Sequence, residues 1–175
     1  MSSDAYAIAR AALTQIPHGV TIIGAEHGDQ RSCATGTCMY VSLAPAKLAI
    51  AEHPGSKTMR LIRDSAKFSV SFLDVTQQDV AMSAGRSATG PDKFASLGIP
   101  VLEREGQAPA VKGSIAVIWC AVESTQPTGD HLLVIGNVVD HWVDATKGDA
   151  LLRYRRRYAN IGRSTSDEAP EGYPV

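Results

Sequence analysis

Apolar residues recur at intervals of three and four along residues 5–16 near the start of this chain. This spacing predicts a short amphipathic helix, which we set at residues 4–16. Ser2, Ser3 and Asp4 precede it and can serve as capping and dipole partners. Pro17 ends the helix, because proline lacks the amide hydrogen that a helix interior needs.

Most other apolar segments are short, β-branched or alternating, which is typical of strands. Strands are expected at residues 19–25, 31–35, 48–51, 67–73, 113–123 and 130–143, the last two being joined by a turn over 124–129. Helices are expected at 56–65 and 77–83, and residues 84–109 are expected to form a long loop with one helical turn near Phe94.

This order of elements predicts a mainly β protein, a β-barrel with a few decorating α-helices. The strands do not alternate regularly with helices, so a doubly wound parallel sheet is not expected. A length of 175 residues suits a single domain. We place that domain at residues 1–163 and expect residues 164–175 to form a mobile tail, because this segment holds few apolar side chains.

Composition and residue spacing bear on which partners the chain is expected to bind. A net charge of -1 gives no electrostatic reason to expect binding to nucleic acid or to an anionic membrane. No apolar run approaches the length of a membrane helix, and the N-terminus does not read as a secretory signal. Cys33, Cys38 and Cys120 show no Cys-x-x-Cys spacing, which favours free thiols in a cytoplasmic protein. The five histidines show no metal-binding spacing, so no metal site is expected.

The segment "HPGSKT", residues 53–58, has the ingredients of a phosphate site. It lacks the glycine spacing of a P-loop, so that interpretation fails. A turn at Pro54 and Gly55 nevertheless delivers Ser56, Lys57 and Thr58 to a helix start, where free amides, hydroxyls and an ammonium can bind one phosphate. The alternative is that Ser56 only caps the helix.

Two further segments carry candidate chemistry. Asp130 and His131 stand where a long apolar strand begins, and His131 is either a surface residue or a contact to a charged or redox-active ligand. In "RYRRRY", residues 153–158, four arginines stand among two tyrosines and can bind phosphate or stack on a planar ring, or form a solvated basic face. A nucleophile elbow and a G-x-G-x-x-G fingerprint are both missing.

Several motifs, in order, resemble the flavin reductase-like family from about residue 16 to residue 162. They are "IPHGVTII", "YVSLAPAKLAIA", "GSKTMRLIRDSAKFSVSFL", "DKFASLGIPVL", "GDHLLVIGNVVD" and "RYRRRYANIG". The resemblance implies an FMN-binding split β-barrel that is dimeric, with FMN or FAD at the interface between two copies and NADH or NADPH as co-substrate.

The resemblance also implies roles for individual residues. Thr35, Gly36 and Thr37 would line the flavin ring, with Cys38 beside them. Ser56, Lys57 and Thr58 would hold the phosphate, and Lys93 and Phe94 would close over the flavin. The catalytic histidine would be His131, and Arg155 or Tyr158 would contact the cofactor or the dinucleotide. Two departures stand out, since Ala34-Thr35-Gly36-Thr37 replaces a Thr-Ala-Ser run and Lys93 replaces an arginine.

The function expected from this resemblance is hydride transfer from NAD(P)H to FMN or FAD, as in the reductase component of a two-component monooxygenase. One alternative is a split-barrel flavoprotein with another redox substrate, such as an oxidase. The other is a non-catalytic flavin carrier or sensor.

Overall fold

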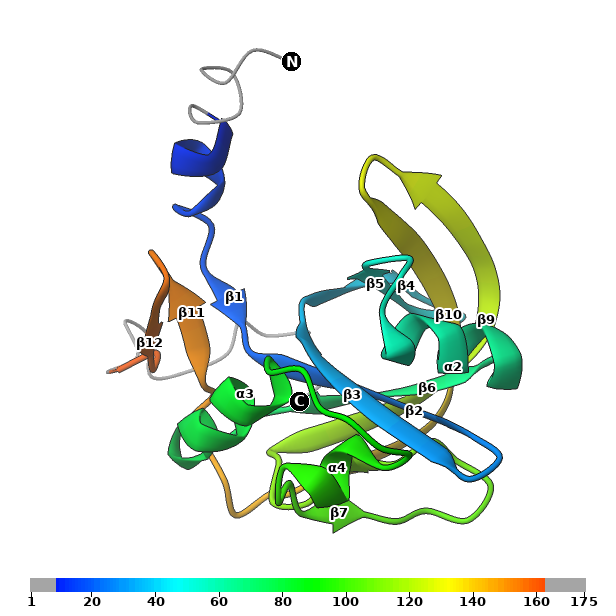
Figure 1. Ribbon diagram of the computed structural model, residues 1–175. Helices are drawn as coiled ribbons and strands as arrows, with labels where there is room; N and C mark the ends of the chain where they lie inside the picture. The colour runs from blue at the N-terminus through cyan, green and yellow to red at the C-terminus, as the bar shows by residue number, and fades with distance from the viewer. Residues whose placement is uncertain (1–8, 163–175) are drawn as a thin grey trace.

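The structure, a computed structural model, describes residues 9–162 and is mainly β, as the sequence predicts (Figure 1). Its largest element is a seven-stranded sheet in the order β3-β2-β6-β9-β10-β5-β4, with every neighbouring pair antiparallel. The strands are β2 (Thr21–His27), β3 (Gln30–Gly36), β4 (Cys38–Leu43), β5 (Ala46–Glu52), β6 (Lys67–Phe72), β9 (Ala116–Thr128) and β10 (His131–Val143).

Two small sheets complete the fold. Strands β1 (His18–Gly19), β11 (Leu152–Tyr154) and β12 (Arg157–Ala159) join the two ends of the described chain, and β7 (Val101–Leu102) pairs with β8 (Ala110–Val111). Figure 1 shows the first of these sheets beside α3, at one side of the large sheet. The basic segment at residues 153–158, one of the candidate ligand contacts, is therefore joined through β11 to β1, the strand that precedes β2.

The helices are short and decorate the sheet. Residues 9–13 are helical, which agrees with the later part of the helix expected at 4–16; residues 4–8 lie outside the described residues, as does the expected tail. The others are α2 (Lys57–Ser65), η1 (Val75–Gln77), α3 (Gln78–Ala84) and α4 (Lys93–Ser96). Within the described chain, no helix is both long and apolar enough to cross a membrane.

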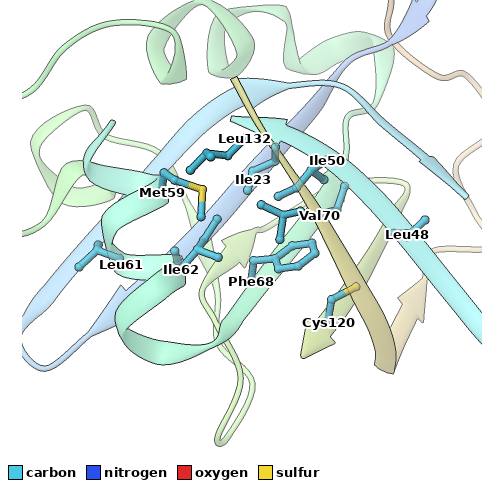
Figure 2. Close-up of a cluster of buried hydrophobic side chains, with 12 residues drawn as sticks. Ile23, Leu48, Ile50, Met59, Leu61, Ile62, Phe68, Val70, Cys120 and Leu132 are labelled. Carbon is cyan, nitrogen blue, oxygen red and sulfur yellow. The ribbon is translucent and has the colours of Figure 1, made fainter. Parts of the chain in front are cut away.

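The core fills the concave side of the sheet, under α2. Met59 and Ile62 project from α2 toward Phe68 and Ile50, and Leu61 of the same helix belongs to the same buried cluster (Figure 2). Each of these five side chains is at most 2% exposed, and burying one contributes roughly 1.5–3 kcal/mol. A second cluster, which includes Phe94 and Leu151, lies between α3, α4 and the strands.

Two expectations about local structure were wrong. The sequence predicts a turn over residues 124–129, but β9 continues to Thr128 and only Gly129 and Asp130 form the turn. Gly129 takes a φ of 63°, which glycine adopts at no steric cost. Pro127 is tolerated in the strand because this part of β9 pairs only with β10 and leaves its other edge open. The hairpin tip therefore projects beyond its neighbours (Figure 1).

The second difference from the expected local structure is the edge strand β4, which the sequence did not predict. Its residues are apolar without clear alternation, and Met39, Tyr40 and Leu43 are 63%, 69% and 79% exposed. Strand β4 pairs with β5 along one edge only. An exposed apolar edge of this kind is a surface that other chains can cover.

Candidate functional site

A cavity of about 540 Å³ opens where β3, β5, β10 and the β1-β11-β12 sheet meet α3. Its walls combine small residues, hydroxyls, imidazoles, arginines and one tyrosine. The lining residues are His18, Gly19, Val20, Thr35, Gly36, Thr37, Ala51, Ala81, Met82, Gly85, Arg86, His131, Arg153 and Tyr158. Such a hollow has the size and mixed polarity of a small-molecule site.

The end of β3 forms one wall of the cavity. The Thr35 hydroxyl donates to the Ala81 carbonyl at 2.9 Å, which fixes α3 against the strand. Gly36 lies against the Ile23 side chain, where an added Cβ would stand 2.5 Å from Ile23 Cδ1. A side chain at residue 36 would therefore collide with the core behind this wall, and only the backbone of Gly36 faces the cavity. Thr37 follows at the surface.

Cys38 begins β4 and lines an adjacent smaller hollow that shares Thr37 and Ala51 with the cavity. Burial raises the pKa of its thiol to about 11, so it is uncharged near neutral pH. A neutral thiol is a weak nucleophile. Cys38 is thus placed as a packing neighbour of the cavity wall.

His131 enters the cavity from the first position of β10, just after the hairpin turn. Its Nδ1 lies 2.8 Å from Asp130 Oδ1, and this bond lowers the pKa of Asp130. Because a carboxylate only accepts, Nδ1 carries the hydrogen, and Nε2 is left free to face a ligand. The His53 ring stands edge-on to it, with centroids 6.1 Å apart.

The start of α2 lies apart from the cavity lining. Ser56 caps the helix by accepting from the Met59 amide at 2.9 Å, as the alternative interpretation of this segment predicts. Lys57 Nζ donates to the carbonyls of Gly90 and Pro91, and Thr58 is 2% exposed and bonded to Ser32 at 2.9 Å. These three side chains are therefore engaged within the chain, and their phosphate role stays a prediction.

Lys93 and Phe94 also lie off the cavity lining. Lys93 Nζ donates to the carbonyls of Cys33 and Ala84 at 2.7 and 2.8 Å, and burial lowers its pKa. Phe94 is wholly buried in the second core cluster. Their predicted contacts with a flavin stay predictions.

Of the two C-terminal candidates, Tyr158 lines the cavity and Arg155 does not. Arg155 Nε donates to Gln15 at 2.8 Å, and its guanidinium lies over Tyr154. Arg153 lines the cavity instead of Arg155, because β11 and β12 form a hairpin in which Arg153 pairs with Tyr158.

Four residues at or near this site were not assigned to it from the sequence: three were not singled out at all, and Arg153 was named only as one of the arginines of "RYRRRY". Arg153 and His18 face each other in register across β1 and β11, and Arg86 follows α3 at the rim. The hairpin turn lies at Arg155 and Arg156, where φ is 48° and 64°. This turn pairs Arg153 with Tyr158, but it could not be predicted, because arginine is not a residue that signals a turn with positive φ. Glu52 is the fourth, a carboxyl beside Ser56 that is 5% exposed.

This arrangement favours binding of an anionic, partly planar molecule. Arg86 and Arg153 are basic side chains that can bind an anion, while Tyr158 offers an aromatic face. No group of three or more potential metal ligands occurs among residues 9–162. The residues that line the cavity can hold and orient an anionic or planar ligand.

Comparisons with known proteins agree with this description. The family model "Flavin reductase like domain" matches residues 13–162. The reductase subunit HsaB of a flavin-dependent monooxygenase from Mycobacterium tuberculosis is 34% identical over 154 residues, 87% of this chain and 80% of that protein. An NADH-dependent flavin reductase from Rhodococcus sp is 29% identical over 94% of this chain and 90% of its own length.

A solved structure described as a homolog of nitrilotriacetate monooxygenase component B, from Mycobacterium thermoresistibile, superimposes with a TM-score of 0.85. It is 28% identical and covers 99% of this chain and 97% of its own. The mainly β architecture is therefore the one that such proteins share.

Proposed function

Because this chain belongs to the flavin reductase-like family, we propose that it transfers hydride from NADH or NADPH to FMN or FAD. The observation that carries the proposal is the single cavity that joins the wall at Thr35–Thr37 to His131, Arg153 and Tyr158. The relatives that are named as flavin reductases support the reaction, and one named for NADH favours that co-substrate.

The residues of the cavity suit two stacked planar ligands. A bound flavin would supply the redox chemistry by accepting hydride from the nicotinamide. The backbone at Gly36 would receive a ring, and the hydroxyls of Thr35 and Thr37 stand beside it. The protein must hold the reacting atoms roughly 3–3.5 Å apart. No strong acid or nucleophile is needed for this reaction.

His131 is the catalytic residue of the proposal. Asp130 holds Nδ1, so Nε2 is free to orient the nicotinamide or, when the imidazole is protonated, to stabilise negative charge that builds on the reduced flavin. Arg153 and Arg86 would bind phosphate groups of the ligands, and Tyr158 would stack on a ring. Arg155 would make only a secondary contact with the ligand, because its guanidinium is bonded to Gln15.

The start of α2 remains the proposed phosphate site. Ser56 stands there with free helix amides, and Lys57 is a flexible chain that can exchange a carbonyl for a phosphate. Thr58 would support the start of α2 through its hydrogen bond to Ser32 on β3, and Lys93 would support β3 through its bond to the Cys33 carbonyl. Phe94 packs next to Lys93 in the second core cluster. Cys38 would close the edge of the ring site.

We further propose a split-barrel homodimer, in which β4 meets a second copy. Support comes from the exposed apolar side chains of Met39, Tyr40 and Leu43 on an unpaired strand edge. Strand β4 begins at Cys38, beside the cavity, so a partner seated there would also cover the flavin site.

A separate flavin-dependent monooxygenase is the proposed recipient of the reduced flavin, by analogy with the reductase subunits among the relatives. A cytoplasmic location is supported by three cysteines that are all free, Cys33, Cys38 and Cys120.

The test is to purify the protein, record its visible spectrum, and measure NADH and NADPH consumption with and without added flavin. Rapid consumption that depends on added flavin supports the proposal. Tightly held flavin with oxidase activity would instead favour a flavoprotein with another substrate. Bound flavin that neither dinucleotide reduces would favour a carrier or sensor.

A further inference from the structure

Glu52, the last residue of β5, places a carboxyl where the pattern of the strand calls for an aliphatic side chain. Leu48, Ile50 and Glu52 alternate onto the buried face of the strand, and Glu52 is only 5% exposed. Its Oε1 lies 3.6 Å from the point where a Cβ on Gly36 would stand. Glu52 therefore sits directly behind the wall that faces the cavity.

The same carboxyl is bound to the residue that caps α2. The Ser56 hydroxyl accepts from the Met59 amide at 2.9 Å and donates to Glu52 Oε2 at 3.3 Å. A hydroxyl has one hydrogen to donate. Ser56 thus cannot donate to Glu52 and to a phosphate at the helix start at the same time.

Glu52 also lies among groups that influence its charge. Burial raises the pKa of its carboxyl to about 7, against the lowering effects of the Ser56 hydrogen bond, of His131 on β10 and of Lys93 on α4. Next along the chain, His53 stands edge-on to His131. The carboxyl therefore changes its charge in the range in which enzymes usually work.

We propose that Glu52 is a positioning residue that competes with the flavin phosphate for the Ser56 hydroxyl, and so sets the preference of the site for phosphorylated flavin over riboflavin. This inference rests on the proposed function. An ionised Glu52 holds the Ser56 hydrogen and repels a phosphate. A protonated Glu52 can donate to the second lone pair of the Ser56 oxygen, which leaves the Ser56 hydrogen free for the phosphate.

The proposal implies that phosphate binding and proton binding are linked. A phosphate monoester carries nearly two negative charges near pH 7. Binding FMN beside Glu52 would therefore draw protons from solvent onto the fraction of carboxyls still ionised at that pH, whereas riboflavin, which lacks the phosphate, would not. Above the pKa of Glu52, FMN must compete with an ionised carboxylate and binds more weakly.

The experiment compares the full-length protein with Glu52→Gln, which keeps the shape of the side chain but cannot ionise. The dissociation constants of FMN and riboflavin are measured by flavin fluorescence at about pH 6 and pH 8.5. For the native protein, we expect the FMN-to-riboflavin preference to fall about tenfold between these values. For Glu52→Gln it should change much less, and this variant also corrects for titration of the FMN phosphate itself.

Calorimetry in two buffers of different ionisation enthalpy gives a second readout. Near pH 7, FMN should bind with net proton uptake to the native protein and with less uptake to Glu52→Gln. A thermal melt at each pH shows that the variants are folded. If Glu52→Gln does not fold, Glu52→Leu replaces it, with the same expected loss of pH dependence.

Identical preferences and pH profiles in the native and variant proteins would overturn this inference and leave the proposed function standing. Failure of the native protein to bind either flavin would overturn the proposed function and the inference together.

Discussion

The guanidinium of Arg153 lies over the ring of Tyr158, 4.5 Å from its centroid, and both side chains line the cavity. Two residues further on, Arg155 makes a similar contact with Tyr154 but lies outside the cavity. The β11-β12 hairpin thus separates two arginines that look equivalent in the sequence.

Replacing Arg153 should therefore weaken binding of the dinucleotide. Loss of one charged contact to a phosphate costs about 1–2 kcal/mol, so Arg153→Ala should raise KM for NADH about tenfold with a smaller effect on kcat. Arg155→Ala is the matched control and should change KM less than about twofold. Steady-state kinetics of both variants check this, and the reverse order of effects would reinstate Arg155 as the ligand contact.

This pair also shows how far the sequence predicts the site. Thr35–Thr37 were expected at the flavin ring, and His131 and Tyr158 at the flavin or the dinucleotide; the fold brings all of them to one cavity. Arg153 was named only among the arginines of "RYRRRY" and was not told apart from Arg155, because its position depends on a turn with positive φ at two arginines. Glu52 was missed because periodicity reports where a side chain points but not why a charge is placed among apolar neighbours.

The strands likewise divide into those that the sequence predicts and those that it does not. Clear alternation or β-branched runs allowed β2, β6, β9 and β10 to be predicted. Strand β4 was not predicted, because its apolar residues do not alternate and most of them are exposed in the described part of the chain, residues 9–162. A strand that is not buried on one face carries no simple period.

Glu52 should make stability depend on pH. Its pKa rises from 4.5 to about 7 on folding because of burial, so the folded state binds more protons between these values. Stability is then greatest below the unfolded pKa and falls as pH rises toward 7. Relative to Glu52→Gln, the native free energy of unfolding should fall by about 2–3 kcal/mol between pH 4.5 and 8. Urea denaturation across this range measures it, and parallel curves for the two proteins would refute it.

Gly24 on β2 should not tolerate a side chain. An added Cβ would overlap the Pro109 carbonyl oxygen and stand 2.6 Å from Ser69 Oγ. Gly24→Ala should therefore lower the free energy of unfolding by about 2–3 kcal/mol. Gly148→Ala, where nothing lies within 4 Å, should change it by less than about 0.5 kcal/mol. Equal stability of the two variants by chemical denaturation would contradict the close contact at Gly24.

Placing a charge on the exposed edge of β4 should separate the proposed dimer. Tyr40 is 69% exposed, so Tyr40→Asp costs the single chain little, but it would bury a carboxylate between two copies. Light scattering should give a dimer mass for the native protein and a monomer mass for Tyr40→Asp. Arg63→Asp, on the exposed side of α2, should remain dimeric. A native protein that is already monomeric would refute the interface.

The most direct test of the central claim is anaerobic stopped-flow mixing of the flavin-loaded protein with NADH, followed through the flavin absorbance. The native protein should bleach the flavin far faster than NADH and free flavin react without it. His131→Ala should bind flavin within about twofold of the native affinity and reduce it at least about tenfold more slowly. Unchanged reduction in His131→Ala, or flavin that stays oxidised in the native protein, would contradict the account.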